Sequence, residues 1–281
     1  MIIKLITIGK NILIISMKKA TIIHHQGYGD IFTNVSLCNY YSKNYELLII
    51  FTTDYDRKKL IDFIYKDNEK IKCIIPKFNT YDGTNTCVKC MSKGMNYGCP
   101  RDISQKCNII DYTDYLDYDN IKIGSFNNYD EWEKFKEKSF SFSHAFYDYA
   151  NLDEKIRINE FKIFRDLDLE KQNFESGNLI NQNYIVTHED KNRGFLLSES
   201  VMNNYTRYNL ENKSDLFSDQ IKIIENSKEI HMIDSSYSVL IYYLSFHNEK
   251  IKKIPKFLHP HPHQRDFNIY KQPTAENWFF L

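Results

Sequence analysis

The chain of 281 residues contains little glycine and proline, no excess of either charge, and few cysteines. With nine Gly, six Pro, 42% hydrophobic and 26% charged residues, its composition is that of a globular protein and excludes collagen-like or disordered sequence. Lys and Arg number 37, as do Asp and Glu, so no overall positive field is available for a nucleic-acid backbone, and we expect no nucleic-acid partner. Six Cys are too few for a disulfide scaffold.

A long apolar segment is also missing. The first sixteen residues, MIIKLITIGKNILIIS, are apolar, but Lys4 and Lys10 interrupt them, and the longest run is far short of the roughly 20 residues that cross a bilayer. No small-residue cleavage site follows, which argues against a signal peptide. An added strand, or an upstream start before a natural start at Met17, agrees better with this segment. We therefore expect no transmembrane span and a cytoplasmic location.

Strand and helix patterns alternate along the first half of the chain. Apolar runs of strand length are separated by segments with helical periodicity, which predicts parallel strands joined by right-handed crossovers. The predicted strands are 20–25, 46–52, 71–75 and 121–124, and the predicted helices are 31–41, 54–65 and 130–138. The stretch 76–120 breaks this alternation and is predicted to be an insertion.

A second α/β set begins at Asn183. Its predicted strands are 184–187, 195–197 and 229–233, and its predicted helices are 217–226 and 235–246. The charged segment 153–175 has helical periodicity, and the tail from Ile251 is predicted to be irregular. The fold class is therefore α/β, with two Rossmann-like domains at 17–150 and 151–281 that face a cleft. Ligands of such sheets bind beyond the carboxyl ends of the strands.

The first candidate site is His24-His25-Gln26-Gly27-Tyr28-Gly29-Asp30, between the first main strand and its helix. Gly27 and Gly29 permit a tight turn and close approach of a ligand to the backbone, and the helix start offers unpaired N–H groups to an anion. His25 and Asp30 are candidate catalytic bases. A plain strand-to-helix turn accounts for the motif equally well.

The second candidate follows the first strand of the second half, at 187–194. His188, Lys191 and Arg193 suit a diphosphate, because Arg offers a two-pronged donor to phosphate oxygens. A charged surface loop is the simpler interpretation of the segment taken alone.

The third candidate is Asp234-Ser235-Ser236, where another strand leads into a helix. The serine hydroxyls and the free N–H groups of the helix start suit a phosphate. Ordinary helix capping explains the same residues.

The cysteines suggest a metal site. Cys87 and Cys90 form a C-x-x-C pair, and Cys99 and Cys107 complete a four-thiolate set of the kind that holds structural zinc. The wide spacing of the second pair leaves free thiols as an equal alternative, with disulfides ranking below both. The His-Pro alternation of His259, His261 and His263 favours a solvated tail over a metal site.

Taken in order, these residues resemble a group of GT-B-type glycosyltransferase-like proteins of phages, large DNA viruses and bacteria, similar to heptosyltransferases and fucosyltransferases. Segment 25–30 resembles the group's opening H-x-G-x-G-D, and segment 188–194 its "HDD…RG" loop, with Glu189 in place of the more usual Asp and Tyr28 in place of a smaller apolar residue. Further matching segments are Phe146-Tyr147, Arg165-Asp166, 230–236 and Asn277-Trp278.

The resemblance implies transfer of a sugar from a nucleotide-diphosphate donor, bound by the second half, to a hydroxyl of a glycan or protein acceptor, bound by the first. It implies no catalytic metal, because cations and helix dipoles stabilise the leaving diphosphate. The abundance of Asn, Ile, Lys and Tyr agrees with an AT-rich, viral source, in which case the location is the host cytoplasm or the virion. Two alternatives remain: a sugar-nucleotide epimerase or hydrolase on the same fold, and a non-catalytic binding protein stapled by zinc.

Overall fold

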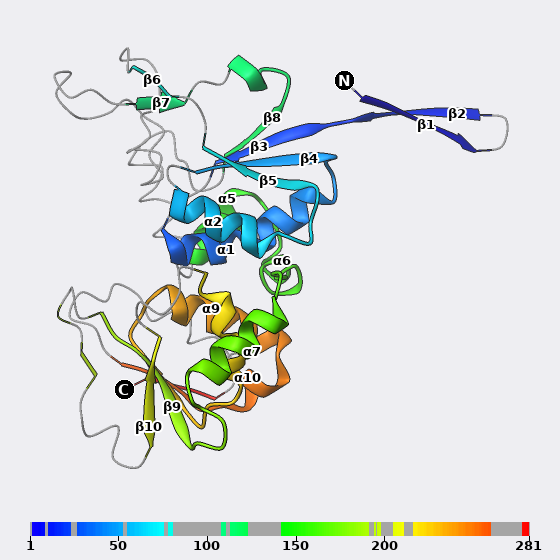
Figure 1. The fold of residues 1–281 in the computed structure, drawn as a ribbon. Coiled ribbons are helices and arrows are strands. Elements are labelled where there is room, and N and C mark those ends of the chain that lie inside the picture. The colour runs from blue at the N-terminus through cyan, green and yellow to red at the C-terminus, as the bar shows by residue number, and fades with distance from the viewer. Residues whose placement is uncertain are drawn as a thin grey trace. The chain divides into compact units, whose positions relative to one another are not determined.

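The protein has an α/β fold with parallel sheets, as the sequence predicts (Figure 1). The computed structural model describes residues 2–8, 11–23, 27–52, 55–75, 78–80, 108–110, 113–122, 142–190, 194, 196–197, 205–210, 216–259 and 277–280. The chain divides into two compact units. Unit 1 comprises Met1–Gln26, Asn34–Lys138 and Phe146–Lys162, and unit 2 comprises Gly27–Thr33, Ser139–Ala145 and Ile163–Leu281. The predicted domain border at residue 150 stays a prediction.

Unit 1 contains a four-stranded parallel sheet in the order β5-β4-β3-β8. The strands are β3 (Lys19–Ile23), β4 (Leu47–Phe51), β5 (Ile71–Ile74) and β8 (Asp119–Lys122), and the helices between the first three are α1 (Tyr28–Ser42) and α2 (Tyr55–Ile64). Residues 48–51 of β4 are all buried, as expected of a strand covered on both faces. The apolar runs in the sequence therefore identified this sheet correctly.

Smaller elements complete the description of this half of the chain. The N-terminal segment forms an antiparallel hairpin of β1 (Ile2–Ile8) and β2 (Asn11–Met17), so it supplies two strands where the sequence suggested one. The predicted insertion contains an antiparallel pair, β6 (Phe78–Thr80) and β7 (Asn108–Ile110), followed by the short helix η1 (Thr113–Tyr115). Helices α5 (Phe142–Tyr149) and α6 (Glu154–Asn159) come next. The predicted helix 130–138 lies outside the described residues.

Two polar side chains of α1 hold the segment that follows α6. The hydroxyl of Ser36 donates to the carbonyl of Arg157 at 2.7 Å. The amide of Asn39 donates to the carbonyls of Glu160 and Lys162 at 3.0 and 2.9 Å. Because Ser36 and Arg157 are fully buried, this attachment is part of the interior of unit 1.

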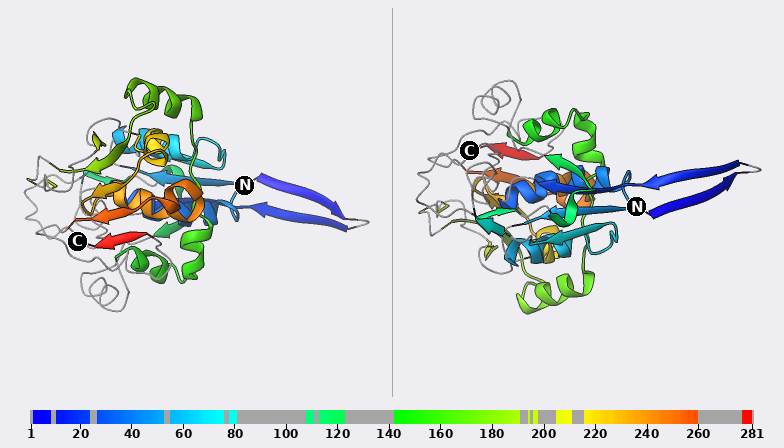
Figure 2. Two further views of the ribbon diagram at one scale, coloured as in Figure 1. Left: turned by 90° about the horizontal axis from the view of Figure 1, so that it is seen from below. Right: turned by 90° about the horizontal axis from the view of Figure 1, so that it is seen from above.

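Unit 2 contains a five-stranded parallel sheet in the order β10-β9-β11-β12-β13. Its strands are β9 (Tyr184–His188), β10 (Thr206–Asn209), β11 (Ile230–Met232), β12 (Lys256–Leu258) and β13 (Trp278–Phe280). Figure 2 (left) shows β12 and β13, orange and red, pointing the same way. The prediction of an irregular tail was therefore wrong for residues 251–258 and 278–280, and residues 196–197 are not a strand.

Unit 2 also contains helices, some of which have described contacts with strands of this sheet. They are α7 (Leu167–Ser176), η4 (Ser218–Gln220), α8 (Ile221–Glu225), α9 (Ser236–His247) and α10 (Glu249–Lys253). The hydroxyl of Tyr184 on β9 donates to the carbonyl of Ile223 on α8 at 2.6 Å, and the rings of Tyr242 on α9 and Trp278 on β13 are 6.4 Å apart. Among the described residues, no helix has the length and apolarity needed to span a bilayer.

The segment predicted as one charged helix, 153–175, is divided into α6 and α7. Asp166 caps α7 by accepting from the N–H of Leu169 at 3.1 Å. Just before this cap, Arg165 pairs with Glu170 of α7 and, at 2.7 Å, with Glu225 of α8. The Arg165 region therefore ties helices of unit 2 together.

Candidate functional site

The strand order of unit 2 places a topological switch point between β9 and β11. β9 is followed in the chain by β10 on one side, whereas β11 lies on the other side and is followed by β12 and β13. At such a point the connections leave in opposite directions, and a crevice forms beyond the carboxyl ends of the two strands. His188 ends β9, and Asp234 and Ser235 follow β11, so two of the predicted motifs meet at this edge.

The first motif forms the start of α1, within unit 2. Gly27 occupies the N-cap, and the carbonyl of Gly27 accepts the first helical bond from Ile31 at 2.9 Å. Asp30, three residues on, accepts from the Gly27 N–H at 3.2 Å, which is half of a capping box. A methyl group on Gly27 would lie only 2.5 Å from this carboxylate. Glycine is therefore required here for the carboxylate to reach the helix start.

Burial raises the pKa of the Asp30 carboxyl to about 7, from an ordinary value of 3.8. Loss of water around the carboxylate is the larger cause, and the hydrogen bond from Gly27 opposes it. A carboxyl group with this pKa is present in both protonation states near neutral pH, which suits a group that exchanges a proton with a ligand.

The third motif forms the start of α9, where serine side chains build a complete capping box. Ser235 is the N-cap, and the hydroxyl of Ser235 accepts from the N–H of Ser238 at 3.4 Å. The hydroxyl of Ser238 in turn accepts from the N–H of Ser235 at 2.9 Å and donates to the carbonyl of Ser235 at 2.6 Å. The hydroxyl of Ser235 thus serves the helix, and Ser236 is the first residue with helical geometry.

The starts of α1 and α9 meet at Gly29 and Ser236. A methyl group on Gly29 would lie 3.8 Å from the Cα of Ser236 and 3.6 Å from a methyl group of Val239. Both residues are in the first turn of their helices, and in the described part of the chain neither N–H has an acceptor. Two helix starts, each with a positive dipole end and an N–H group without an acceptor, therefore lie close together, and helix starts of this kind attract anions.

An aromatic cluster joins the three motifs. The ring of Phe217 lies 5.1 Å from Tyr28, 5.6 Å from Phe32 and 4.7 Å from Tyr237. The ring of His188 lies 4.9 Å from Tyr237. Tyr28 and Phe217 are half-buried, whereas Phe32 and Tyr237 are buried. Phe217 thus joins Tyr28 to Tyr237 at the start of α9, and Tyr237 in turn contacts His188. The sequence analysis did not identify Phe217.

Phe217 has a backbone conformation that aromatic residues rarely adopt, with φ 51° and ψ −54°. The N–H of Ser218 donates to the carbonyl of Leu216, so Phe217 is the centre of a tight γ-turn. Such a conformation costs on the order of 1–3 kcal/mol and concentrates at functional sites. No sequence pattern announces a bulky residue at positive φ, which is why Phe217 was missed.

The loop after β9 contains the second motif. Glu189 is buried, and the carboxylate of Glu189 lies 2.5 Å from the guanidinium of Arg207 and accepts from the N–H of Leu197 at 2.8 Å. Glu189 therefore holds the loop in place. Gly194 has φ 77°, which glycine adopts without strain. Lys191 and Arg193 lie outside the described residues, as does His25.

No protein-family model and no curated protein matches the sequence. The fold is similar to the crystal structure of a glycosyl transferase family 9 protein from Veillonella parvula DSM 2008, with a TM-score of 0.50. The similarity covers 94% of this chain and 85% of the other, at 8% sequence identity. At that identity the likeness establishes the fold alone.

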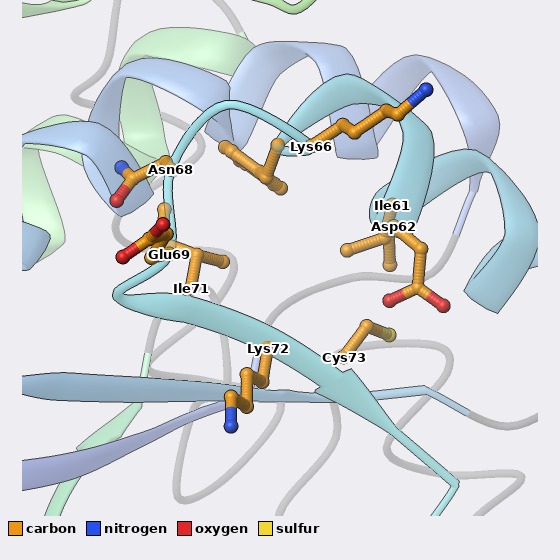
Figure 3. A pocket seen from close by; sticks show the side chains of 9 residues that line it. Ile61, Asp62, Lys66, Asn68, Glu69, Ile71, Lys72 and Cys73 are labelled. Carbon is orange, nitrogen blue, oxygen red and sulfur yellow. The ribbon is translucent and has the colours of Figure 1, made fainter.

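Two further observations concern the predicted zinc site and unit 1. Cys87, Cys90, Cys99 and Cys107 are outside the described residues, and within the described residues no group of three or more His, Cys, Asp or Glu side chains could hold a metal ion. In unit 1, a groove of about 450 Å³ is lined by residues such as Ile61, Lys66 and Cys73 (Figure 3). It lies where β5 begins, at the edge of the sheet opposite to the one that binds ligands in α/β folds.

Proposed function

We propose that the protein is a GT-B glycosyltransferase that moves a sugar from a nucleotide-diphosphate donor to the hydroxyl of a glycan or protein acceptor. The observation that carries the proposal is the close approach of two helix starts at Gly29 and Ser236, whose N–H groups have no acceptor in the described part of the chain. Their position beside the switch point of the unit 2 sheet is where a nucleotide would lie. The fold-level likeness to a family 9 glycosyl transferase agrees with this assignment.

In the proposed reaction, the acceptor hydroxyl gives its proton to Asp30 while its oxygen attacks the anomeric carbon of the donor sugar. The bond from that carbon to the diphosphate breaks, and the nucleoside diphosphate leaves with the electron pair. A carboxylate with a raised pKa is a stronger base than an ordinary one, so Asp30 suits this role, and His25 is the second candidate.

The leaving diphosphate needs positive groups around it. We propose that the Gly29 and Ser236 N–H groups and the two helix dipoles supply part of this stabilisation, with Lys191, Arg193 and the side chains of the Asp234–Ser236 turn as further contacts. Main-chain donors and cations together would remove the need for a catalytic metal.

A pair of substitutions at Ser236 tests the phosphate site. Ser236→Pro removes the free N–H at the first helical position, where proline fits, and the extended backbone of Ser235 (φ −157°, ψ 177°) is compatible with a following proline. Ser236→Ala keeps the N–H and removes the hydroxyl. Calorimetric titration with nucleoside diphosphates should show about a tenfold or larger loss of affinity for the Pro variant and a smaller loss for Ala, because hydrogen bonds to charged groups contribute about 1.5–3 kcal/mol.

Equal affinity of Ser236→Pro and the unchanged protein would contradict the site. Arg193→Ala should also abolish donor binding, and a normal affinity for the nucleotide sugar in that variant would refute the role of Arg193. Product analysis with a bound donor separates the reactions: transfer yields a glycosylated acceptor, hydrolysis yields free sugar, and epimerisation yields a changed nucleotide sugar.

A further inference from the structure

A chain of hydrogen bonds runs through unit 2 from the half-buried Glu229 to the buried His259. The carboxylate of Glu229 lies 3.0 Å from Nε2 of His231, and Nδ1 of His231 lies 3.1 Å from Nε2 of His259. The His231 ring stacks on Phe257 at 4.5 Å with an interplanar angle of 11°, which fixes its plane. His231 and His259 are buried, so His259 does not belong to a solvated tail as the sequence predicted.

The chain determines which nitrogen of each ring carries a proton. An ionised carboxylate accepts only, so Nε2 of His231 must donate to Glu229. In a neutral ring, Nδ1 of His231 is then an acceptor, and Nε2 of His259 must donate to it. It follows that Nδ1 of His259 carries a lone pair, and within the described part of the chain this nitrogen has no partner.

The environment keeps both rings neutral. Burial, assisted by the neighbouring His231, lowers the pKa of His259 to about 4, and burial also lowers the pKa of His231 against the opposing effect of Glu229. At neutral pH His259 is therefore an acceptor at Nδ1.

His259 lies at the ligand-binding edge of the sheet. It follows the last residue of β12, and its N–H donates to the carbonyl of Met232, the last residue of β11, at 2.8 Å. The segment after Met232 leads directly into the capping box of α9. The residue His259 thus lies at the end of the strand next to β11, and β11 leads to the proposed phosphate site.

We propose that His259 is a ligand-contacting residue, whose Nδ1 accepts a hydrogen bond from a hydroxyl group of the nucleotide sugar, and that His231 and Glu229 are positioning residues that fix this acceptor. The proposal rests on the proposed function, because it assumes a nucleotide-sugar ligand. The hydroxyl belongs either to the ribose or to the transferred sugar, which share the same chemistry.

Two amide substitutions test the two ring nitrogens of His259 separately. The amide group of Gln reaches the place of Nε2, so His259→Gln keeps the donor to His231 and loses the Nδ1 acceptor. The amide group of Asn reaches the place of Nδ1, so His259→Asn keeps an acceptor there. Calorimetric titration of the full chain should show a loss of affinity of about three- to tenfold for the Gln variant and less for Asn, as expected for one hydrogen bond.

The ligands in this titration identify the hydroxyl. If the Gln variant binds nucleoside diphosphate more weakly than the unchanged protein does, but binds the 2′- or 3′-deoxy form equally well, the hydroxyl belongs to the ribose. If the Gln variant loses affinity only for the nucleotide sugar, the hydroxyl belongs to the transferred sugar. Equal affinities of the Gln variant and the unchanged protein for every ligand would overturn the inference and leave the proposed function standing. Failure of the unchanged protein to bind any nucleotide would overturn both.

Nitrogen NMR of the imidazole groups provides a readout that does not depend on a ligand. At pH 7, the His259 ring should show a protonated Nε2 and an unprotonated Nδ1, and Glu229→Leu should mix the two tautomers of His231 and His259. A protonated Nδ1 in the unchanged protein would refute the inference whatever the binding results.

Discussion

The ring of Phe217 lies 4.7 Å from the ring of Tyr237, although the backbone of Phe217 is held at φ 51° to put it there. Tyr237 stands in the first turn of α9, directly after Ser236. The strain of the γ-turn and the packing of the ring act against each other, and the contacts with Tyr28, Phe32 and Tyr237 offset the strain.

Two substitutions separate these opposing effects at Phe217. Both Phe217→Ala and Phe217→Gly remove the ring, but only Gly adopts a positive φ without strain. We expect both variants to be less stable than the unchanged protein, with Gly the more stable of the two by about 1 kcal/mol, the reverse of their usual order. Urea unfolding followed by circular dichroism measures the difference. A more stable Ala variant would show that the turn is not strained.

The pair of Glu189 and Arg207 should be strongly coupled. Glu189 is 2% exposed, so the removal of Arg207 leaves a buried carboxylate without its cation. We expect Arg207→Ala and Glu189→Gln each to destabilise the protein, and the double variant to lose less than the sum, with a coupling energy of about 1 kcal/mol or more. A double-mutant cycle from chemical unfolding gives this value. Additive losses would contradict a role for the pair in holding the loop.

Acid should weaken the fold through the two buried histidines. The pKa of His259 is about 4 in the folded chain, and the ordinary value is 6.5, so the unfolded chain takes up a proton first as the pH falls. Stability is therefore lost progressively between pH 6.5 and 4, at up to about 1.4 kcal/mol per pH unit for one proton. His259→Gln should flatten this part of the pH profile. An unchanged slope in that variant would assign the acid sensitivity to other groups.

Asp30 has the opposite pH dependence. Its pKa is raised to about 7, so its contribution to stability is present below pH 3.8 and is lost as the pH rises through 7. Loss of the proton from Asp30 also produces the carboxylate that acts as the base. The transfer rate should therefore increase as the pH rises through 7. Asp30→Asn retains an oxygen that can accept from Gly27, and should lower kcat by about a hundredfold or more. Full activity in the Asn variant would leave His25 as the base.

The cysteines of the predicted insertion lead to a separate test, on zinc. We propose that Cys87, Cys90, Cys99 and Cys107 bind one structural Zn²⁺ ion. Metal analysis of the purified chain should find about one zinc per molecule, and Cys90→Ser should release it. As a matched control, Cys38→Ser changes a buried thiol of α1 and should leave the zinc content unchanged. A protein without zinc would support free thiols.

The strongest sequence signals concerned the strands and helices with long apolar patterns. The runs around β3, β4 and β9 identified parallel strands, and the periodicity of 235–246 identified α9 within one residue at each end. Ser235 caps α9, as the simpler interpretation of the serines expects, whereas the phosphate site stays a prediction. These features depend on neighbouring residues in the chain, which is the information that a single sequence carries.

The features that were missed depend on distant contacts. β12 and β13 have three residues each and gain their stability from pairing in the sheet, so their sequences carry no strand pattern of their own. His259 stands beside prolines, which suggests a solvated tail, but its partner His231 is on another strand. Phe217 takes its place from three rings far away in the sequence.

The attachment of α1 to residues 157–162 has a consequence for biosynthesis. Ser36 and Asn39 leave the ribosome early, but the carbonyls that accept their hydrogen bonds follow more than a hundred residues later. These hydrogen bonds of α1 can therefore form only after more than half of the protein has been synthesised. During this interval water can satisfy the hydroxyl of Ser36 and the amide of Asn39, so this part of unit 1 completes its packing only late in synthesis.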